Sequence, residues 1–385
     1  MLFANGDGMP KGIRGSIAKK DSIVCLRKNK FFRKFEHLMM RSHWYCNAEK
    51  MQKKLIQLNA QNLFLSHPLS DYKNIAHHPL VKWADIIHLH WVPGFVDYST
   101  FFRRVRKPIV WTIHDKYPAV GVLHYCSEHY PIPDNLYEFD QLCRKIKRKG
   151  VLQSKSLHLV AISAQMASLF AESDVLKGLP TTIIHNGVET DVYYPNDLVK
   201  KDFLNKYLSV PIDFENKKIL MFSSYEIWDY NKGLRRVIKA IESLKIPNVI
   251  LVVVGRNELC EMPVASFPII LTGLLTDQIE IVKLYSIADL FIQASYEESF
   301  GQTLLEAMAC GCPVVSTSVG VAPELIKPFN GIICDGFDEN ALAHGIKSAL
   351  STFYDSTIIR SHIVENFSYD KIAKEYICLY SEILQ

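Results

Sequence analysis

Residues 290–316 read LFIQASYEESFGQTLLEAMACGCPVVS, and the order of elements in this stretch decides the fold. An apolar run ending at about Ala294 predicts a buried strand, and the helical spacing of apolar residues that begins near residues 301–303 predicts a helix. The apolar run at 313–316 predicts the next strand. A strand, a covering helix and a second strand are the repeating unit of parallel sheets.

The same alternation of short apolar runs and longer helical patterns extends from about residue 80 onward, as in sheets covered by helices on both faces. A polar, turn-rich stretch at 194–216 separates two series of strands. The sequence therefore predicts an α/β fold with two doubly wound, Rossmann-like domains, at 1–195 and 215–365. Residues 366–385 have amphipathic spacing, and we expect a C-terminal helix there that can cross back to the first domain. The expected strands are 86–90, 109–113, 158–162 and 182–184 in the first series, and 218–222, 249–254, 269–271, 290–292 and 313–316 in the second.

The composition is that of a globular protein. Of the 385 residues, 48% are hydrophobic and 22% are charged, and the 44 basic and 40 acidic side chains nearly balance, which argues against nucleic acid as a partner. No apolar run approaches the roughly 18–20 residues of a membrane-spanning helix, and the first residues do not have the pattern of a secretory signal. The nine cysteines include no C-x-x-C pair. We therefore expect a cytoplasmic protein with reduced thiols.

The sequence pattern of the first 80 residues gives the weakest prediction of structure. A Rossmann-like domain normally opens with a strand and a glycine-rich turn, whereas residues 1–8 read MLFANGDG, so we expect a first strand–helix unit that is short or missing. Residues 18–35 mix basic and aromatic side chains, and residues 101–107 and 143–149 repeat the mixture. These segments indicate either contact with a membrane surface or anionic acceptor, or a solvated basic face.

Two carboxylates in the opening stretch, Glu298 and Glu306, flank the N-terminus of the predicted helix. Backbone amides in the first turn of a helix have no partner within the helix, and the helix dipole adds partial positive charge there. Both features favour a bound phosphate, so we expect a diphosphate site at this helix. The amides concerned are those of Ser299, Phe300, Gly301 and Gln302.

The E-x7-E spacing of Glu298 and Glu306, in the setting EESFGQTLLEAMACGCPVVS, resembles the family-four retaining glycosyltransferases of the GT-B fold. The likeness covers about residues 80–385 and includes IHNGVE at 184–189, which is similar to the I-x-N-G-V-D segment of that family. Residues 84–91 and 108–115, which read ADIIHLHW and PIVWTIHD, further resemble its polysaccharide-assembly branch, of the colanic-acid type. Further matches are Lys232, Gly233, Gly255 and the segment 288–290.

The resemblance implies a GT-B architecture in which two Rossmann-like domains face each other across a cleft. The C-terminal domain would hold a nucleotide diphosphate sugar and the N-terminal domain would hold the acceptor. Glu306 would bind the ribose hydroxyls and Glu298 the donor sugar, while Lys232 would neutralise the leaving diphosphate. His114 would face the donor sugar from the opposite domain. The implied catalytic residues are His114, Lys232 and Glu298, and the implied donor-binding residues are Ser299, Phe300, Gly301, Gln302, Thr303 and Glu306.

The implied function is retaining transfer of a hexosyl group to a saccharide or lipid-linked saccharide acceptor in surface polysaccharide assembly. We expect no cofactor beyond the nucleotide sugar substrate and no metal, because no D-x-D pair follows a strand. His88 and His90 share one strand face, but no third metal ligand accompanies them. The protein would act in the cytoplasm, with peripheral attachment to the inner face of the membrane if the basic segments bind it.

Two departures from the family pattern leave other functions open. Residues 222–225 read FSSY where the family often has a Gly-Arg pair, and the N-terminal glycine loop is not evident. A non-catalytic, nucleotide-sugar-binding accessory subunit is therefore the main alternative, followed by a phosphorylase or epimerase of the same fold. A dehydrogenase is disfavoured because Gly255 is not part of a G-x-G-x-x-G motif.

Overall fold

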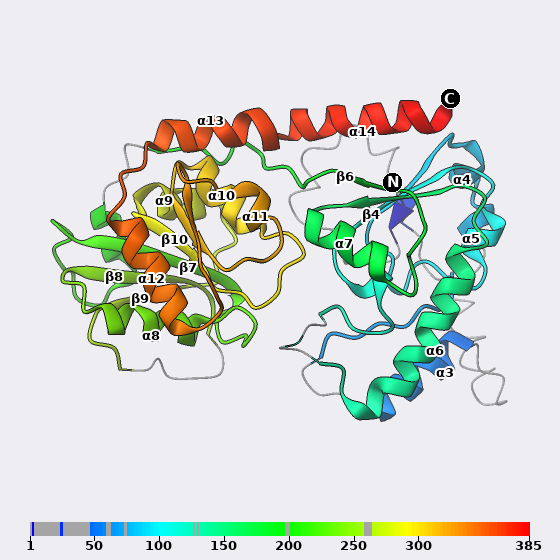
Figure 1. The fold of residues 1–385 in the computed structure, drawn as a ribbon, viewed down its shortest axis with the longest axis horizontal. Helices are drawn as coiled ribbons and strands as arrows, with labels where there is room; N and C mark the ends of the chain where they lie inside the picture. Colours follow the sequence, from blue (N-terminus) through cyan, green and yellow to red (C-terminus); the bar gives the residue numbers. More distant parts are fainter. Residues whose placement is uncertain are drawn as a thin grey trace.

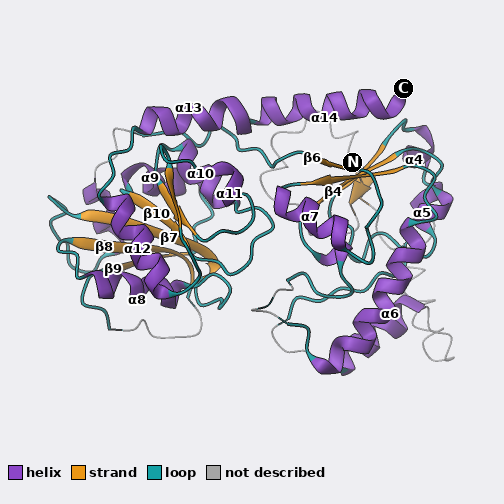
Figure 2. Ribbon diagram, viewed as in Figure 1, coloured by secondary structure: helices purple, strands orange, loops and turns teal. Residues whose placement is uncertain are grey.

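The computed structural model contains two large parallel sheets that lie side by side, each with helices packed on it (Figures 1 and 2). The expected α/β class with two sheets is confirmed. The short first strand–helix unit expected at residues 1–8 and the basic segment 18–35 lie outside the described residues, apart from two short strands. These are β1 (Leu2–Phe3) and β2 (Val24–Cys25), which pair in parallel with each other. The structure describes residues 2–3, 24–25, 47–58, 63–72, 75–125, 128, 131–196, 201–257 and 264–385.

The N-terminal domain is built on a four-stranded parallel sheet whose strands follow one another in chain order. Each strand lies within a residue of its expected position or overlaps it, because buried parallel strands are continuous apolar runs. The strands are β3 (Ile87–Leu89), β4 (Ile109–Ile113), β5 (Leu157–Ala161) and β6 (Thr181–Ile183). The helices of this domain are α3 (Asn47–Gln57), α4 (Pro79–Trp83), α5 (Phe101–Arg104), α6 (Asp134–Val151) and α7 (Ala164–Glu172).

The C-terminal domain is a six-stranded parallel sheet in the order β12-β11-β10-β7-β8-β9. From β7 the chain adds strands in one direction, then returns and adds β10 to the other side of β7. Ligands of doubly wound sheets bind at the carboxyl ends of the two strands where the order reverses, which are β7 and β10 here. The sequence did not predict β12. The strands are β7 (Lys218–Glu226), β8 (Val249–Arg256), β9 (Ile269–Gly273), β10 (Leu290–Gln293), β11 (Val314–Ser316) and β12 (Gly331–Ile333).

Alternate residues of β7 pack on opposite faces of this sheet. Leu220 and Phe222 pack with α8 and α12, whereas Ile219 and Met221 join the larger core with α9, α10 and α13. The consecutive apolar residues 219–222 of this strand therefore bury both faces of the sheet. The helices are α8 (Leu234–Leu244), α9 (Gln278–Ile287), α10 (Gln302–Ala309), α11 (Ala322–Leu325), α12 (Glu339–Leu350), α13 (Ser356–Phe367) and α14 (Tyr369–Leu384).

The last helix connects the two domains. Helices α13 and α14 run along the same side of the molecule, and the C-terminus lies over the N-terminal domain (Figure 1). Ile372 and Leu379 of α14 are buried in a cluster with Val110 of β4 and Val160 of β5. The Tyr376 hydroxyl and Thr112 Oγ1 lie 2.7 Å apart, in hydrogen-bond contact. The helix therefore covers one face of the N-terminal sheet.

The polar stretch 194–216, expected to separate the domains, contains a short 3₁₀ helix, Lys201–Tyr207, which packs on the C-terminal sheet.

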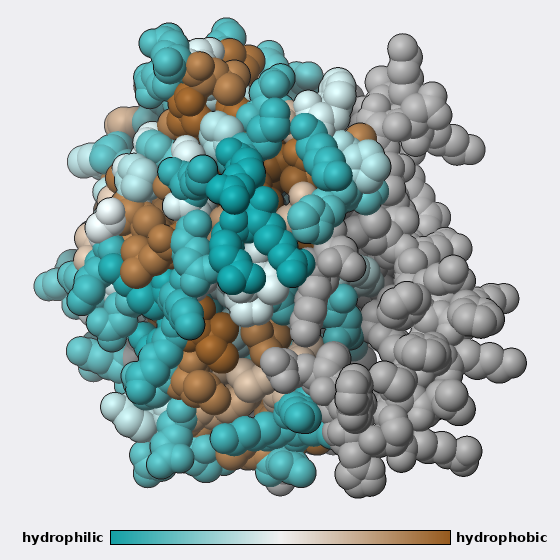
Figure 3. Space-filling model, turned by 90° about the vertical axis from the view of Figure 1, so that its right-hand side faces the viewer, coloured by the Kyte–Doolittle hydropathy of each residue, from teal (hydrophilic) through white to brown (hydrophobic). Residues whose placement is uncertain are grey.

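The basic segments of the N-terminal domain have their apolar residues in the core. Phe101 and Phe102 of α5 are buried, and so is Cys143 of α6. The cations of 101–107 reach solvent while its two phenylalanines do not, so a surface contact of this segment would involve its cations alone. Figure 3 looks onto the end of the molecule that carries α4, α5 and α6, where the described residues are largely hydrophilic with separate hydrophobic patches. No helix in the described residues is long and apolar enough to cross a bilayer.

Candidate active site

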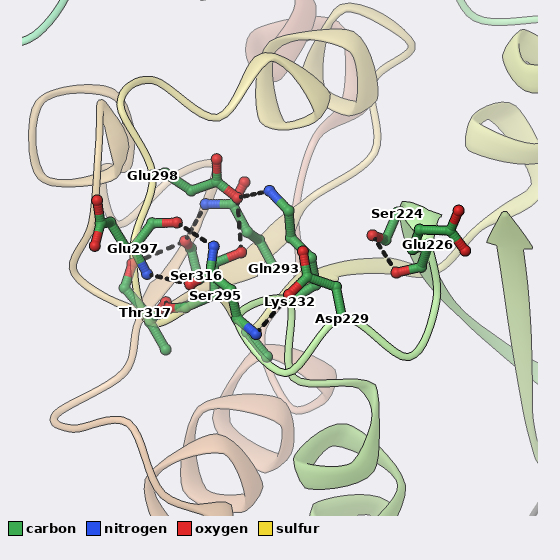
Figure 4. Close-up of polar contacts among 12 residues, drawn as sticks. Ser224, Glu226, Asp229, Lys232, Gln293, Ser295, Glu297, Glu298, Ser316 and Thr317 are labelled. Carbon is green, nitrogen blue, oxygen red and sulfur yellow. Dashed lines mark hydrogen bonds and ion pairs between the residues drawn. The ribbon is translucent and has the colours of Figure 1, made fainter. Parts of the chain in front are cut away.

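The loop between β10 and α10 brings the two expected carboxylates to the sheet edge. It enters α10 through Gly301, whose φ of 100° is favourable only for glycine. A Cβ on Gly301 would lie 2.9 Å from Oε1 at the end of the Gln293 side chain, so a larger residue there would also displace this side chain. Thr317 Oγ1 donates to the carbonyl of Ser295 at 2.6 Å and ties the loop to the end of β11 (Figure 4).

Lys232 and Glu298 are in direct contact. Lys232 lies in the loop that follows β7, Glu298 lies in the loop that follows β10, and Nζ is 2.6 Å from Oε1 (Figure 4). Ser295 Oγ donates to the same carboxylate oxygen at 2.7 Å. Burial alone would lower the pKa of Lys232, but the charge and hydrogen bond of Glu298 raise it above the ordinary value. The ammonium therefore stays charged at the point where the strand order reverses.

Asn231 joins the two loops and was not singled out in the sequence. Its Nδ2 donates to the carbonyl of Glu297 at 2.9 Å, and its Oδ1 accepts from the amide of Glu297 at 2.9 Å. This reciprocal pair fixes the backbone beside Lys232 relative to the backbone beside Glu298. Gly233 follows with a φ of 80°, and a Cβ there would meet the carbonyl oxygen of Ala294 at 2.6 Å. The signal in the sequence was the N-K-G triplet, whose composition also fits a turn before a helix.

The amides at the start of α10 are the expected phosphate donors. Among the described residues, those of Ser299, Phe300, Gly301 and Gln302 donate to no other group. The side chain of Phe300 is buried in the core, so only its backbone can take part in binding. Thr303 lies half-buried in the first turn. The expected phosphate site thus has open donors beside the Lys232 ammonium.

Glu306 lines a pocket of about 340 Å³ to which both domains contribute. Its carboxyl accepts a hydrogen bond from the Tyr285 hydroxyl at 3.3 Å. Burial raises the pKa of Glu306 to about 7, and the bond from Tyr285 opposes this only in part. Gln302 of the same helix donates to the carbonyl of Gly187 at 3.0 Å, across the domain interface. The pocket is lined by His114, Asn186, Gly187, Val188, Glu189, Tyr193, Gln278, Gln302, Glu306 and Tyr369.

His114 reaches this pocket from the carboxyl end of β4. Its Nε2 lies 3.0 Å from Nδ1 of His90, which follows β3. Loss of water around the imidazole lowers the pKa of His114, and Asp115 opposes this shift. His88 has both ring nitrogens in contact, with Thr112 Oγ1 at 2.8 Å and with the Tyr380 hydroxyl at 2.6 Å. In the described part of the chain, no three His, Cys, Asp or Glu side chains converge as a metal site.

Two family models match the chain, one on each domain. The model described as "Glycosyltransferase Family 4" matches residues 48–192, and "Glycosyl transferases group 1" matches residues 210–356. The chain belongs to the glycosyltransferases of the GT-B fold. Lys232, Glu298 and Glu306 all lie within the second match, and His114 lies within the first.

Similar proteins agree with this assignment. An uncharacterised glycosyltransferase of Methanocaldococcus jannaschii is 28% identical over 323 residues, which cover 77% of this chain and 75% of that protein. The solved sucrose-phosphate synthase of Thermosynechococcus elongatus has a TM-score of 0.63 at 18% identity, covering 95% of this chain and 85% of that one. Anabaena HepE in complex with UDP-glucose has a TM-score of 0.56 at 19% identity, covering 79% and 81%. At such identities the solved structures show the shared fold, and the expected GT-B architecture is confirmed.

The two domains of this glycosyltransferase touch through polar contacts that the sequence did not reveal. The amide of Ala164, at the N-terminus of α7, donates to Glu324 Oε1 at 2.8 Å, and His185 Nε2 lies 2.8 Å from Glu324 Oε2. Burial would raise the pKa of Glu324, but these two contacts lower it below the ordinary value. Ser163 Oγ also donates to the carbonyl of Ser299 at 2.9 Å. The cleft is therefore closed beside the helix that carries the candidate diphosphate site.

Proposed function

We propose that this glycosyltransferase moves a hexosyl group from a nucleotide diphosphate sugar to a saccharide or lipid-linked saccharide acceptor. The transfer would retain the anomeric configuration and would serve surface polysaccharide assembly, as in the colanic-acid-type branch that the sequence resembles. The observation that carries the proposal is the contact of Lys232 with Glu298 beside the open amides of α10. Both lie where ligands of doubly wound sheets bind.

The proposed donor site stabilises the charge that develops on the leaving diphosphate. Lys232 and the first amides of α10 would contact the phosphate oxygens, and such preorganised donors commonly supply the largest catalytic effect. Diphosphate binding would draw the Lys232 ammonium away from Glu298, and that carboxylate would then accept hydrogen bonds from donor-sugar hydroxyls. Glu306, when ionised, would accept from the two ribose hydroxyls.

His114 would approach the donor sugar from the N-terminal domain. A lowered pKa keeps its imidazole neutral near pH 7, so it can accept or donate a hydrogen bond to a sugar hydroxyl without adding charge. We propose that no metal takes part, because Lys232 and the α10 amides already provide positive charge for the diphosphate. Activity that persists in excess EDTA would support this, and loss of activity that Mg²⁺ or Mn²⁺ restores would overturn it.

The reaction is tested by release of nucleoside diphosphate from a panel of UDP-, GDP-, ADP- and TDP-linked hexoses. One donor is expected to be consumed faster when saccharide or lipid-linked acceptors are added, and proton NMR of the new anomeric centre is expected to show the donor configuration. Product of the opposite configuration would overturn retention. Nucleotide binding without turnover of any donor would favour the accessory-subunit alternative, which the absence of arginine from residues 222–225 motivates.

We propose that the protein works in the cytoplasm, with the basic end of its N-terminal domain against the anionic inner membrane surface. Exposed cations on α5 and α6, among them Arg103, Lys145 and Lys149, support this, because each basic side chain near such a surface adds about 1 kcal/mol. Co-sedimentation with phosphatidylglycerol vesicles that is lost with phosphatidylcholine vesicles or in high salt is the expected result. Equal sedimentation with both vesicle types would contradict it.

A further inference from the structure

Four aromatic rings stack beside the candidate site, on the N-terminal domain. His124 lies 4.9 Å from Tyr117 and 5.1 Å from Trp91 between ring centroids, with interplanar angles of 11° and 22°. Phe64 lies 4.1 Å from His124 and 5.9 Å from Trp91, nearly parallel to the latter at 11°. The inner rings of Tyr117 and His124 are buried, whereas Phe64 is 56% exposed and Trp91 is 50% exposed.

The inner part of this stack is held rigidly. Nδ1 of His124 lies 2.7 Å from Asp115 Oδ2, and its Nε2 lies 2.8 Å from Ser66 Oγ, so both ring nitrogens have partners. The amide of His124 donates to the carbonyl of Phe64 at 3.3 Å. The two half-exposed rings, Phe64 and Trp91, therefore pack on a ring whose position is fixed.

The stack lies next to the residues that face the donor. Three consecutive residues after β4 connect them: His114 lines the pocket with Glu306, Asp115 contacts His124, and Lys116 pairs with Glu297 of the C-terminal domain at 2.9 Å. Trp91 follows His90, whose ring contacts His114. The two half-exposed rings therefore belong to the N-terminal domain and lie near His114, which lines the pocket together with Glu306.

We propose that Phe64 and Trp91 form a stacking platform for a pyranose ring of the acceptor saccharide. This inference rests on the proposed function. One face of a pyranose carries C–H groups with slight positive charge, which pack favourably on the negative face of an aromatic ring, while the hydroxyls at the ring edge stay hydrated. Covering two half-exposed rings also removes apolar surface from water. A sugar held there would present an edge hydroxyl toward His114 and the donor.

The platform is tested by fluorine NMR on the full chain labelled with 5-fluorotryptophan. The Trp91 resonance is assigned as the one missing from Trp91→Phe, and the buried Trp111 serves as an internal reference. The probes are methyl β-D-glucopyranoside, methyl β-D-galactopyranoside and methyl α-D-mannopyranoside, with sorbitol as a control that has no ring face. We expect at least one glycoside to shift the Trp91 resonance in a saturable way, with Trp111 unmoved and sorbitol without effect.

Variants of Phe64 separate the role of the ring from that of bulk. Phe64→Leu is expected to weaken the glycoside response about tenfold, which corresponds to about 1.4 kcal/mol, while Phe64→Tyr keeps the affinity. Tyr137→Ala, which removes an exposed ring on α6, is the matched control and is expected to change nothing. Nucleotide-induced thermal stabilisation should be equal in all of these variants.

Three results would overturn the platform: no glycoside shifts the Trp91 resonance, sorbitol shifts it equally, or a nucleotide alone shifts it and Phe64→Leu loses nucleotide stabilisation. The last would assign the rings to a nucleobase. A saturable glycoside shift in a protein that no nucleotide stabilises would support the platform and overturn the proposed donor site instead.

Discussion

Replacing Glu306 with glutamine is expected to stabilise the fold at high pH and to weaken nucleotide binding. The pKa of this carboxyl is raised from its ordinary 4.5 to about 7, chiefly by burial. At about 1.4 kcal/mol per pH unit, that difference corresponds to roughly 3 kcal/mol. In the unfolded chain the carboxyl ionises near pH 4.5, whereas in the folded chain it keeps its proton until about pH 7. The contribution of Glu306 to stability is therefore complete below about pH 4.5 and is lost progressively as the pH rises to about 7.

Glu306→Gln keeps the shape of the side chain and an oxygen that can accept from Tyr285, but it cannot ionise. The free energy of unfolding of the variant and of the wild type, measured in urea from pH 5 to pH 8, should be similar at pH 5. The variant should be more stable by up to about 3 kcal/mol at pH 8. A difference that does not change with pH would refute the assignment of the raised pKa to Glu306.

Nucleotide binding should depend on the same carboxyl in the opposite direction: affinity should rise with pH, whereas the contribution of Glu306 to folding stability falls. If the ionised form accepts from the ribose hydroxyls, nucleotide affinity should rise by up to about tenfold per pH unit below pH 7 and level off above it. Calorimetric titration at pH 6, 7 and 8 measures this, with Glu306→Gln as the control that should bind weakly at every pH. Equal affinity at pH 6 and pH 8 in the wild type would contradict the ribose role.

Three further predictions concern the two loops and the last helix. Lys232→Ala should lower turnover about 10²- to 10³-fold in a donor-release assay while reducing nucleotide affinity much less, and equal losses in both would contradict a role in the transition state. Asn231→Ala leaves two backbone groups of Glu297 without the Asn231 side chain as partner and should cost about 1–3 kcal/mol in urea unfolding, so an unchanged midpoint would argue against the reciprocal pair of hydrogen bonds. Leu379→Ala, at a site that is 4% exposed on α14, should cost about 2–5 kcal/mol. Ile377→Ala, at a site 60% exposed, should change stability by less than about 0.5 kcal/mol, and similar losses in both variants would contradict the packing of α14.

The sequence predicted most of both sheets because buried parallel strands carry a strong signal. Residues 109–113 and 290–293 are apolar over nearly their whole length and are strands in the structure. Strand β12 was missed because only three residues, Gly331–Ile333, pair at the sheet edge, next to the turn residue Asn330. The last helix was expected from its spacing, since Ile372 and Leu379 recur on one face.

Residue spacing also placed Glu298 and Glu306 near the start of one helix, and the adjacency of β7 and β10 then brings Lys232 to Glu298. Contacts between the domains could not be predicted in this way. Ser163 and Ser299 are 136 residues apart and share a single hydrogen bond, which leaves no periodic pattern in either segment.

The aromatic residues of 101–107 show that composition alone does not predict which side chains are exposed. Neighbouring cations suggested a surface segment, but Phe101 and Phe102 point into the core of the N-terminal domain. Composition shows which side chains occur together, and only the direction of α5 decides which of them reach solvent.

Thermal unfolding with UDP, GDP, ADP and CMP, in wild type and Glu306→Ala, tests the central claim that α10 and Glu306 form a nucleotide site. A nucleotide at about 100 times its dissociation constant should stabilise the wild type by about 2.7 kcal/mol. The account predicts that one of these nucleotides does so and that the variant loses the effect. Stabilisation of both proteins to the same extent, or of neither by any nucleotide, would contradict it.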